Sequence, residues 1–273
     1  MMTRSMSFDI ARRGFLVLTL VFFLAPFLWL ATTAYKPSNA IFSIPPHLFF
    51  EPTLDQFRNA LRVFDVGSLV TSSLLIAGGS MALSLMLGVP AGYALARSTH
   101  PMAMGVAYFF MTIRMVPAVA ALIPFYLLMR DIGLIGSWMS VVLINCVLNT
   151  AFVSWMMFSY FRGLPKELEE AALTDGCRQF GAFWKVSLPA VRSGIIASAL
   201  FCVLFSWNDF LFAMFLTRLD SKPISVALLS AYGTKDITWG TLGALAHFST
   251  VPIVLIVLVL NRYFVQGLTK GIN

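Results

Sequence analysis

Long apolar stretches are the feature that most constrains this chain. Each contains about the 20 residues needed to cross the hydrocarbon core of a bilayer. The expected spans cover residues about 12–35, 67–96, 102–129, 134–161, 192–217 and 239–263. Lipid offers no hydrogen-bond partner to a free backbone group, so each span is expected to be an α-helix. The sequence therefore predicts an all-α membrane protein with six transmembrane helices, which form a single transmembrane domain over residues 1–273.

Composition agrees with lipid as the main solvent. Hydrophobic residues make up 59% of the chain and charged residues only 11%, whereas a soluble domain carries about 25% charged residues. The net charge is +7, but the basic residues are scattered among loops and form no stripe that would indicate a nucleic-acid partner. The three cysteines form no CxxC pair and the three histidines lie far apart, so neither a disulfide framework nor a metal site is expected.

The distribution of Lys and Arg sets the expected orientation. With the N-terminus inside, the inner segments hold eleven Lys and Arg residues and the outer segments seven. Six spans then place both termini in the cytoplasm, together with a long loop over 162–190. The first apolar stretch is too long for the core of a signal peptide, so we expect an uncleaved first helix. Several spans contain residues that often mark kinks: Pro26, Gly88 with Pro90, Pro117 with Pro124, and Pro252.

The inner loop contains a compact polar block. Its first part, PKELEEAALTDG at residues 165–176, carries four acids and one lysine. Pro165 suits the first position of a helix, the acids lie near the positive helix end, and Gly176 is a natural stop. One face of this helix is expected to carry Leu168, Ala171 and Ala172.

A second short helix is expected over RQFGAFWKVS, residues 178–187, before Leu188 and Pro189 end it. Phe180, Phe183 and Trp184 would share one side, and aromatic side chains of this kind often anchor protein contacts. A solvated loop with partial helicity explains the periodicity equally well.

The motif inside this block resembles a known one. Glu170-Ala171-Ala172 is followed after three residues by Gly176, and after nine more by Val186-Ser187-Leu188-Pro189. This pattern resembles the EAA loop of binding-protein-dependent ABC transporter permeases. The resemblance implies a coupling helix that docks on a cytoplasmic ATPase subunit. It assigns this coupling role to Glu170, Ala171, Ala172, Asp175, Gly176, Phe180, Leu188 and Pro189.

Other segments extend the resemblance over essentially the whole chain. Arg114-Met115-Val116-Pro117, Ile123-Pro124-Phe125-Tyr126 and the stretch 205–211 look like the smaller carbohydrate-uptake permeases of the maltose type, as do residues 35–37 and 263–271. Asp209 stands where Glu is found as often. The resemblance implies the type I ABC importer permease fold in the bacterial inner membrane. It also implies a second permease subunit, two ATPase subunits that hold ATP and Mg, an extracytoplasmic substrate-binding protein and a sugar-like solute.

Polar residues within the spans are candidates for a substrate pathway. A charge at the bilayer centre costs about 2.5–3.5 kcal/mol on insertion scales, so Arg114 should face the interior of the bundle. Asp209 is its one evident partner within the spans, although a purely structural pair, a contact with another subunit or snorkelling of Arg114 are alternatives. Planar polar groups and aromatic faces bind sugars, which adds Asn145, Asn149, Trp207 and Asn208 as possible pathway residues. Hydrogen bonding between helices is the alternative role for them, and the partner permease is an alternative holder of the substrate contacts.

The chain contains no GxxxxGK[ST] phosphate loop. We therefore expect no ATP hydrolysis, no cofactor and no enzymatic activity in this chain itself. The sequence predicts a permease subunit that forms half of the pathway of an ATP-driven importer. An ion-coupled secondary carrier is the alternative, but the chain shows one clear intramembrane acid and no repeat between its halves. An intramembrane enzyme would need a catalytic constellation within the spans, and none is found.

Overall fold

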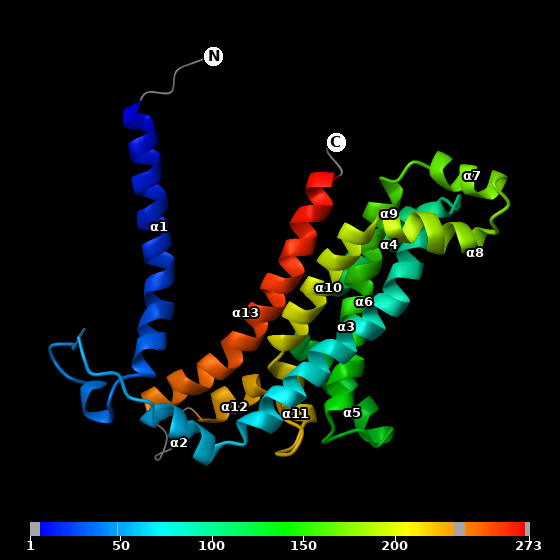
Figure 1. Ribbon diagram of the computed structural model, residues 1–273. Coiled ribbons are helices and arrows are strands. Elements are labelled where there is room, and N and C mark those ends of the chain that lie inside the picture. The colour runs from blue at the N-terminus through cyan, green and yellow to red at the C-terminus, as the bar shows by residue number, and fades with distance from the viewer. Residues whose placement is uncertain (1–5, 48, 232–237, 271–273) are drawn as a thin grey trace. The chain divides into compact units, whose positions relative to one another are not determined.

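The computed structural model describes residues 6–47, 49–231 and 238–270 (Figure 1). Apart from one isolated bridge between Gly136 and Thr217, every regular element in these ranges is helical. The elements are α1 (Met6–Thr33), η1 (Ser38–Ala40), α2 (Asp55–Val63), α3 (Val66–Arg97), α4 (Ala103–Ile113), α5 (Ala118–Asp131), α6 (Trp138–Arg162), α7 (Glu167–Thr174), α8 (Gln179–Ala182), η2 (Phe183–Ser187), α9 (Leu188–Ala190), α10 (Arg192–Trp207), α11 (Leu211–Leu216), α12 (Ile224–Ala231) and α13 (Trp239–Lys270). The prediction of an all-α fold is thus confirmed for the described residues.

Four helical segments are long and apolar enough to cross a membrane: Arg12–Thr33, α3, α6 and Trp239–Val259. Two further pairs pass the same test only together. The helices α4 and α5 bend by 93° at their junction, and the segment Gln179–Ala190 bends by 73° where it meets α10. The described chain therefore supports four spans, or up to six if each bent pair counts as one.

Two of the expected spans are interrupted. Where the sequence predicts one segment over 102–129, α4 ends at Ile113 and α5 begins at Ala118. Pro117 lacks a backbone N–H and disfavours helical geometry in the residue before it, which favours an interruption at this point. The segment expected over 192–217 is likewise divided into α10 and α11, with the interruption between Trp207 and Leu211.

The chain divides into two compact units. The first contains the residues up to Val66 and Leu228–Thr250. Its centre is a small apolar cluster of Ala34, Ala60 and Ala244, and Ala60 places α2 in this cluster. The fully buried Gln56 of α2 binds within this unit: its amide oxygen accepts bonds from Thr238 Oγ1 at 2.8 Å and Thr241 Oγ1 at 3.2 Å.

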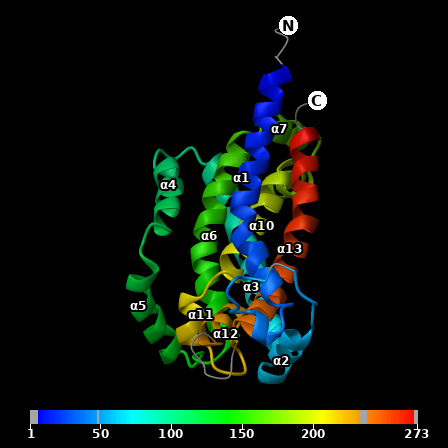
Figure 2. The same ribbon diagram turned by 90° about the vertical axis from the view of Figure 1, so that its left-hand side faces the viewer.

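The second unit, Gly67–Ala227 with the residues from Val251 onward, is built around α6. Both α4 and α10 pack on this helix, and α4 and α5 lie to one side of it (Figure 2). At one end of the unit is α7, on the same side as the C-terminal end of α13, while α5 and α11 lie at the opposite end (Figure 1).

Small residues hold α3 close against α6. Ser80 Oγ donates to the carbonyl of Val142 at 3.4 Å, and Ser84 Oγ donates to the carbonyl of Cys146 at 3.3 Å. One and two turns further along α3, Gly88 and Gly92 leave no room for a side chain. Small residues of this kind let membrane helices approach closely without a hydrophobic driving force. We call this contact the α3–α6 seam, and we define it by Ser80, Ser84, Gly88 and Gly92.

The seam predicts a steric penalty at Gly92. A Cβ there would lie 2.7 Å from Met157 Cβ and 2.8 Å from the carbonyl oxygen of Ser154. We expect Gly92→Ala to destabilise the protein by about 1–3 kcal/mol, because the two backbones must separate. The matched control is Gly105→Ala in α4, where a Cβ meets no atom within 4 Å. Thermal unfolding in detergent measures both, and equal melting temperatures for the two variants would contradict the seam.

Candidate functional site

The polar block of residues 162–190 begins with the predicted helix. The observed helix α7 starts at Glu167, two residues after Pro165, and ends at Thr174. Gly176 follows with a φ of +90°, in the left-handed region that favours glycine. The predicted helix and its stop at Gly176 are therefore confirmed, but Pro165 lies before the helix instead of at its first position.

The second half of the block is longer than expected. Three short helical elements, α8, η2 and α9, follow one another without a gap from Gln179 to Ala190. Leu188 and Pro189 form the first turn of α9 instead of ending the helix, so that part of the prediction is wrong. Proline is tolerated in a first turn because its missing N–H has no intrahelical partner there. The chain turns at Val191 and enters α10.

Most residues that the EAA resemblance assigns to coupling are exposed: Glu170, Ala171, Asp175, Gly176, Phe180 and Pro189. Ala172 is buried and Leu188 is half-buried. The aromatic residues divide as well, since Phe180 is 74% exposed and contacts Trp184, whereas Phe183 is 7% exposed and belongs to the core. The expectation that these three aromatic side chains share one side is therefore wrong for Phe183.

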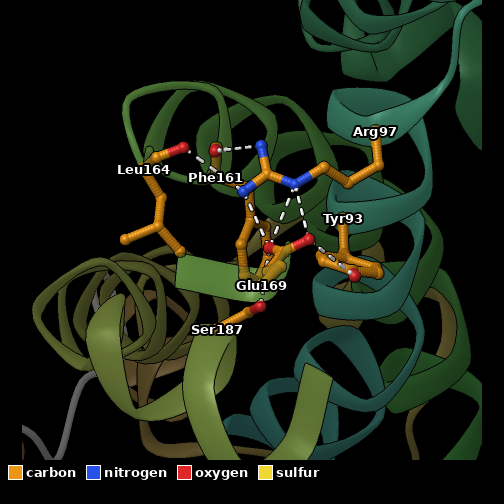
Figure 3. Close-up of polar contacts among 6 residues, drawn as sticks. All are labelled: Tyr93, Arg97, Phe161, Leu164, Glu169 and Ser187. Carbon is orange, nitrogen blue, oxygen red and sulfur yellow. Dashed lines mark hydrogen bonds and ion pairs between the residues drawn. The ribbon is translucent and has the colours of Figure 1, made fainter. Parts of the chain in front are cut away.

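A buried carboxylate holds the block to α3 (Figure 3). Glu169 Oε1 accepts a bond of 2.7 Å from Arg97 Nη2, and both carboxylate oxygens lie 3.0 Å from Arg97 Nε. Ser187 Oγ of η2 donates to Oε1 at 2.7 Å, and the hydroxyl of Tyr93 donates to Oε2 at 3.2 Å. The side chains of Arg97 and Glu169 are only 15% and 12% exposed. Such charge-assisted bonds are the strong class of hydrogen bond.

The same guanidinium also binds the end of α6 (Figure 3). Arg97 Nη1 donates to the carbonyl of Phe161 at 2.9 Å, and Nη2 donates to the carbonyl of Leu164 at 3.3 Å. Carbonyls at the C-terminal end of a helix have no partner within the helix, so a cation there satisfies them and opposes the helix dipole. One side chain therefore connects α3, α6 and α7.

Sequence reasoning missed this network of Tyr93, Arg97, Glu169 and Ser187. Arg97 was detectable as the first charge after a long uncharged stretch that begins beyond Asp65. The choice of acid was not detectable, because Glu167, Glu169 and Glu170 lie within four residues of one another. Only the packed structure shows which of them points inward.

The electrostatics of the network favour an ionised carboxylate. Burial raises the pKa of Glu169, but hydrogen bonds from Arg97 and Ser187 and the positive charge of Arg97 lower it by more. The net pKa of Glu169 therefore lies below the ordinary glutamate value.

A second polar cluster lies among α6, α10 and the two helix interruptions. Arg114, between α4 and α5, donates through Nη2 to Asn149 Oδ1, and its guanidinium lies 3.6 Å from the ring centre of Phe205. Asn149 Nδ2 in turn donates to Ser206 Oγ at 3.0 Å. This arrangement combines an amide contact with a cation–π contact in a low-dielectric region.

Asp209 has a different amide partner. Asn145 Nδ2 donates to Asp209 Oδ2 at 3.1 Å, and the backbone N–H of Phe212 donates to Oδ1 at 3.3 Å. Among the residues that the structure describes, no ion pair joins Arg114 to Asp209. The hypothesis of a direct pair is replaced by two neighbouring amide-bound charges.

A cavity of about 230 Å³ is lined by both charges, Arg114 and Asp209, and by Asn145 and Phe205, and its remaining lining residues are apolar. The other predicted pathway residues do not line it. Asn149 is fully buried beside Arg114, and Trp207 is only 4% exposed. The amide of Asn208 is directed to the carbonyl of Leu204 at 2.8 Å. Within the described ranges, no group of three or more His, Cys, Asp or Glu side chains is placed to hold a metal ion.

Apolar helices of membrane-spanning length, broken segments around a cavity lined by two charged side chains, and a polar helical block at one end define an integral membrane protein of the transport type. Residues 84–270 match the family described as "binding-protein-dependent transport system inner membrane component". The chain belongs to this family of ABC transporter permeases in the inner membrane.

Individual relatives cover nearly the whole chain. The probable ABC transporter permease protein y4oR of Sinorhizobium fredii is 32% identical over 91% of this chain and 90% of its own length. The trehalose transport system permease protein SugB of Mycobacterium tuberculosis is 30% identical, with 91% of each chain covered. A permease chain in the crystal structure of a bacterial ABC transporter for the acidic polysaccharide alginate has the same fold, with a TM-score of 0.81 over 97% of this chain and 100% of its own, at 21% identity.

The lowered pKa of Glu169 predicts a dependence of stability on pH. The folded-state pKa lies below the unfolded value of about 4.3, so the stabilisation is fully present above that value and is lost as the pH falls through the folded-state pKa. Glu169→Gln should cost about 1.5–3 kcal/mol at neutral pH, the contribution of hydrogen bonds to a charged group.

The gap in melting temperature between wild type and this variant should stay constant from neutral pH to about pH 5 and shrink below about pH 4. Thermal unfolding in detergent at a series of pH values measures this gap. Glu167→Gln, which removes an exposed carboxylate from the same helix, is the control. A gap for Glu169→Gln that does not change with pH would contradict the assignment.

Proposed function

We propose that the chain is a permease subunit of an ATP-driven importer for a sugar or sugar-like solute that an extracytoplasmic binding protein delivers. The observation that carries this proposal is the full-length relationship to transport permeases. The family is defined by dependence on a binding protein, and one relative that matches 91% of this chain is named for trehalose transport. The fold shared with the alginate transporter chain is consistent with it.

In this proposal the chain has six spans, with both termini and the block of 162–190 in the cytoplasm. It pairs with a second permease subunit and two ATPase subunits, and these hold ATP and Mg. The exposed residues Glu170, Asp175 and Phe180 supply an acidic and aromatic surface suited to docking. ATP binding by the partners then biases an equilibrium between outward-open and inward-open states of the permease pair.

The cavity beside α6 is the proposed contact point for the solute. Its lining combines a cation, a carboxylate, an amide and an aromatic ring, which are the groups that bind saccharides. Arg114 Nε is buried and has no hydrogen-bond partner in the described structure. This N–H can bind a hydroxyl or carboxylate of a solute when the neighbouring side chains move aside.

Uptake into proteoliposomes tests the function directly. The complex is reconstituted with its ATPase subunits and binding protein, and radiolabelled trehalose and an alginate oligosaccharide serve as a neutral and an acidic probe. We expect MgATP-dependent uptake of a saccharide. Uptake that persists without the ATPase subunits, driven by an ion gradient, would instead indicate a secondary carrier.

Docking through the block predicts the effect of a charge reversal. Glu170→Lys should weaken association with the ATPase subunits about tenfold, the equivalent of one lost contact of about 1.4 kcal/mol, without unfolding the spans. The control is Asp131→Lys at the end of α5, which reverses an exposed acid at the opposite end of the unit. Co-purification and titration of the ATPase subunits measure the difference, and equal affinity for both variants would argue against docking through α7.

A solute contact at the cavity predicts a binding defect. Asp209→Asn retains the size of the side chain but removes its charge, so we expect the KM for the transported probe to rise about tenfold or more. Association with the ATPase subunits should not change. An unaltered KM in this variant would exclude Asp209 from the solute pathway.

A further inference from the structure

Two neighbouring acids of α7 differ in their surroundings. Glu170 is exposed, while Glu169 is buried against α3 and η2. We infer that Glu169 is a positioning residue that fixes both halves of the block to α3 and α6, so that movement imposed on the block is passed to these two helices. This inference rests on the proposed function, because it concerns how force from an ATPase subunit reaches the membrane-spanning part.

The hydrogen bonds of Glu169 cover both halves of the block. The carboxylate belongs to α7, and its Oε1 also receives the 2.7 Å bond from Ser187, which belongs to the segment 179–190. The same oxygen, Glu169 Oε1, also accepts the 2.7 Å bond from Arg97 Nη2 of α3. Sliding either half of the block along α3 would break a charge-assisted bond in a region largely shielded from water.

Aromatic packing supplies a second, independent connection between the same elements. The ring of Phe183 in η2 lies 4.6 Å from the ring of Tyr93 in α3 and 6.2 Å from that of Phe161 in α6, measured between ring centres. These residues join the apolar cluster that also contains Val153 and Met157 of α6. The polar network thus lies directly over a packed core, and such cores resist gradual deformation.

The arrangement separates docking from transmission within one helix. The outward acid, Glu170, is the proposed contact to the ATPase, and its removal would weaken association. The inward acid, Glu169, has no exposed surface of consequence, since its side chain is 12% exposed. Its removal should leave association with the ATPase subunits intact but weaken the transmission of movement from the block to α3 and α6.

Hydrogen–deuterium exchange on the complete complex tests this separation, with MgATP alone as the probe. The complex contains this chain, its partner permease and the ATPase subunits in lipid nanodiscs. In the wild type we expect MgATP to change exchange in the block and, by about fivefold or more, in residues 90–97 and 157–162 at the ends of α3 and α6. In Glu169→Gln the ATPase subunits should co-purify normally and the block should still respond, but the response of the two helix ends should fall, because only the aromatic contacts of Phe183 then connect them to the block.

Two further variants make the outcome decisive. Glu167→Gln, the exposed acid of the same helix, should behave like the wild type. Ser187→Ala removes the bond between the second half of the block and the carboxylate. Without nucleotide it should speed exchange over residues 183–190 about fivefold and leave α7 unchanged. Ser187→Ala decides the question if Glu169→Gln does not assemble.

The inference is overturned if the helix ends of Glu169→Gln respond to MgATP as in the wild type, or if Ser187→Ala exchanges like the wild type. Failure of the proposed function gives a different result: the wild type itself would not retain the ATPase subunits, or its block would not respond to MgATP.

Discussion

The backbone of this chain must satisfy its own hydrogen bonds wherever lipid surrounds it, and this constraint governs the rest of the structure. Unbroken helices meet it without help, but each interruption leaves free groups that side chains must bind. Asp209 does so after α10, where its carboxylate accepts the N–H of Phe212 and its own carbonyl accepts a bond of 3.0 Å from Ser225 Oγ. The polar residues at membrane depth are therefore a consequence of the broken segments as much as candidates for solute contact.

The second unit combines a tightly packed pair of helices, α3 and α6, with two interrupted segments. Hydrogen bonds from serines and the close contacts of glycines hold α3 to α6 along the seam, and Arg97 closes its end by binding the carbonyls of Phe161 and Leu164. By contrast, α4 meets α5 at a bend of 93° and α10 stops before α11. Conformational change requires dihedral angles that can alter, and residues at element ends are where such changes are usually absorbed.

The sequence was sufficient to predict the helices but not the positions at which they are interrupted. Hydropathy located the four long apolar helices, and proline was expected to mark kinks. Yet Pro26, Pro90 and Pro252 lie inside intact helices, while only Pro117 coincides with a full interruption. The difference lies in the neighbours: the turn before Pro117 carries Arg114, whose guanidinium is bound by partners on α6 and α10. Such tertiary contacts override local preference, and a single sequence does not reveal them.

In the candidate site, too, the sequence predicted the local structure but not the tertiary contacts. The spacing of the block identified α7 and its stop at Gly176, because these depend on local residue types. The two adjacent acids illustrate the limit. Consecutive helical residues point about 100° apart, so Glu169 and Glu170 have different surroundings, but which of them faces inward depends on where Arg97 lies.

The position of α6 joins the two polar sites of the second unit. This helix supplies the amide of Asn145 to the cavity and, at its end, the carbonyl of Phe161 to Arg97. From Asn149, which binds Arg114, to Phe161 is twelve residues, a distance of about 18 Å along an α-helix. If an ATPase binds the block, α6 can act as one rigid body between the block and the cavity, because it is unbroken and well packed. The chain can then change the shape of the cavity only where it is already broken, around Arg114 and Asp209, and these are the two charges that face the cavity.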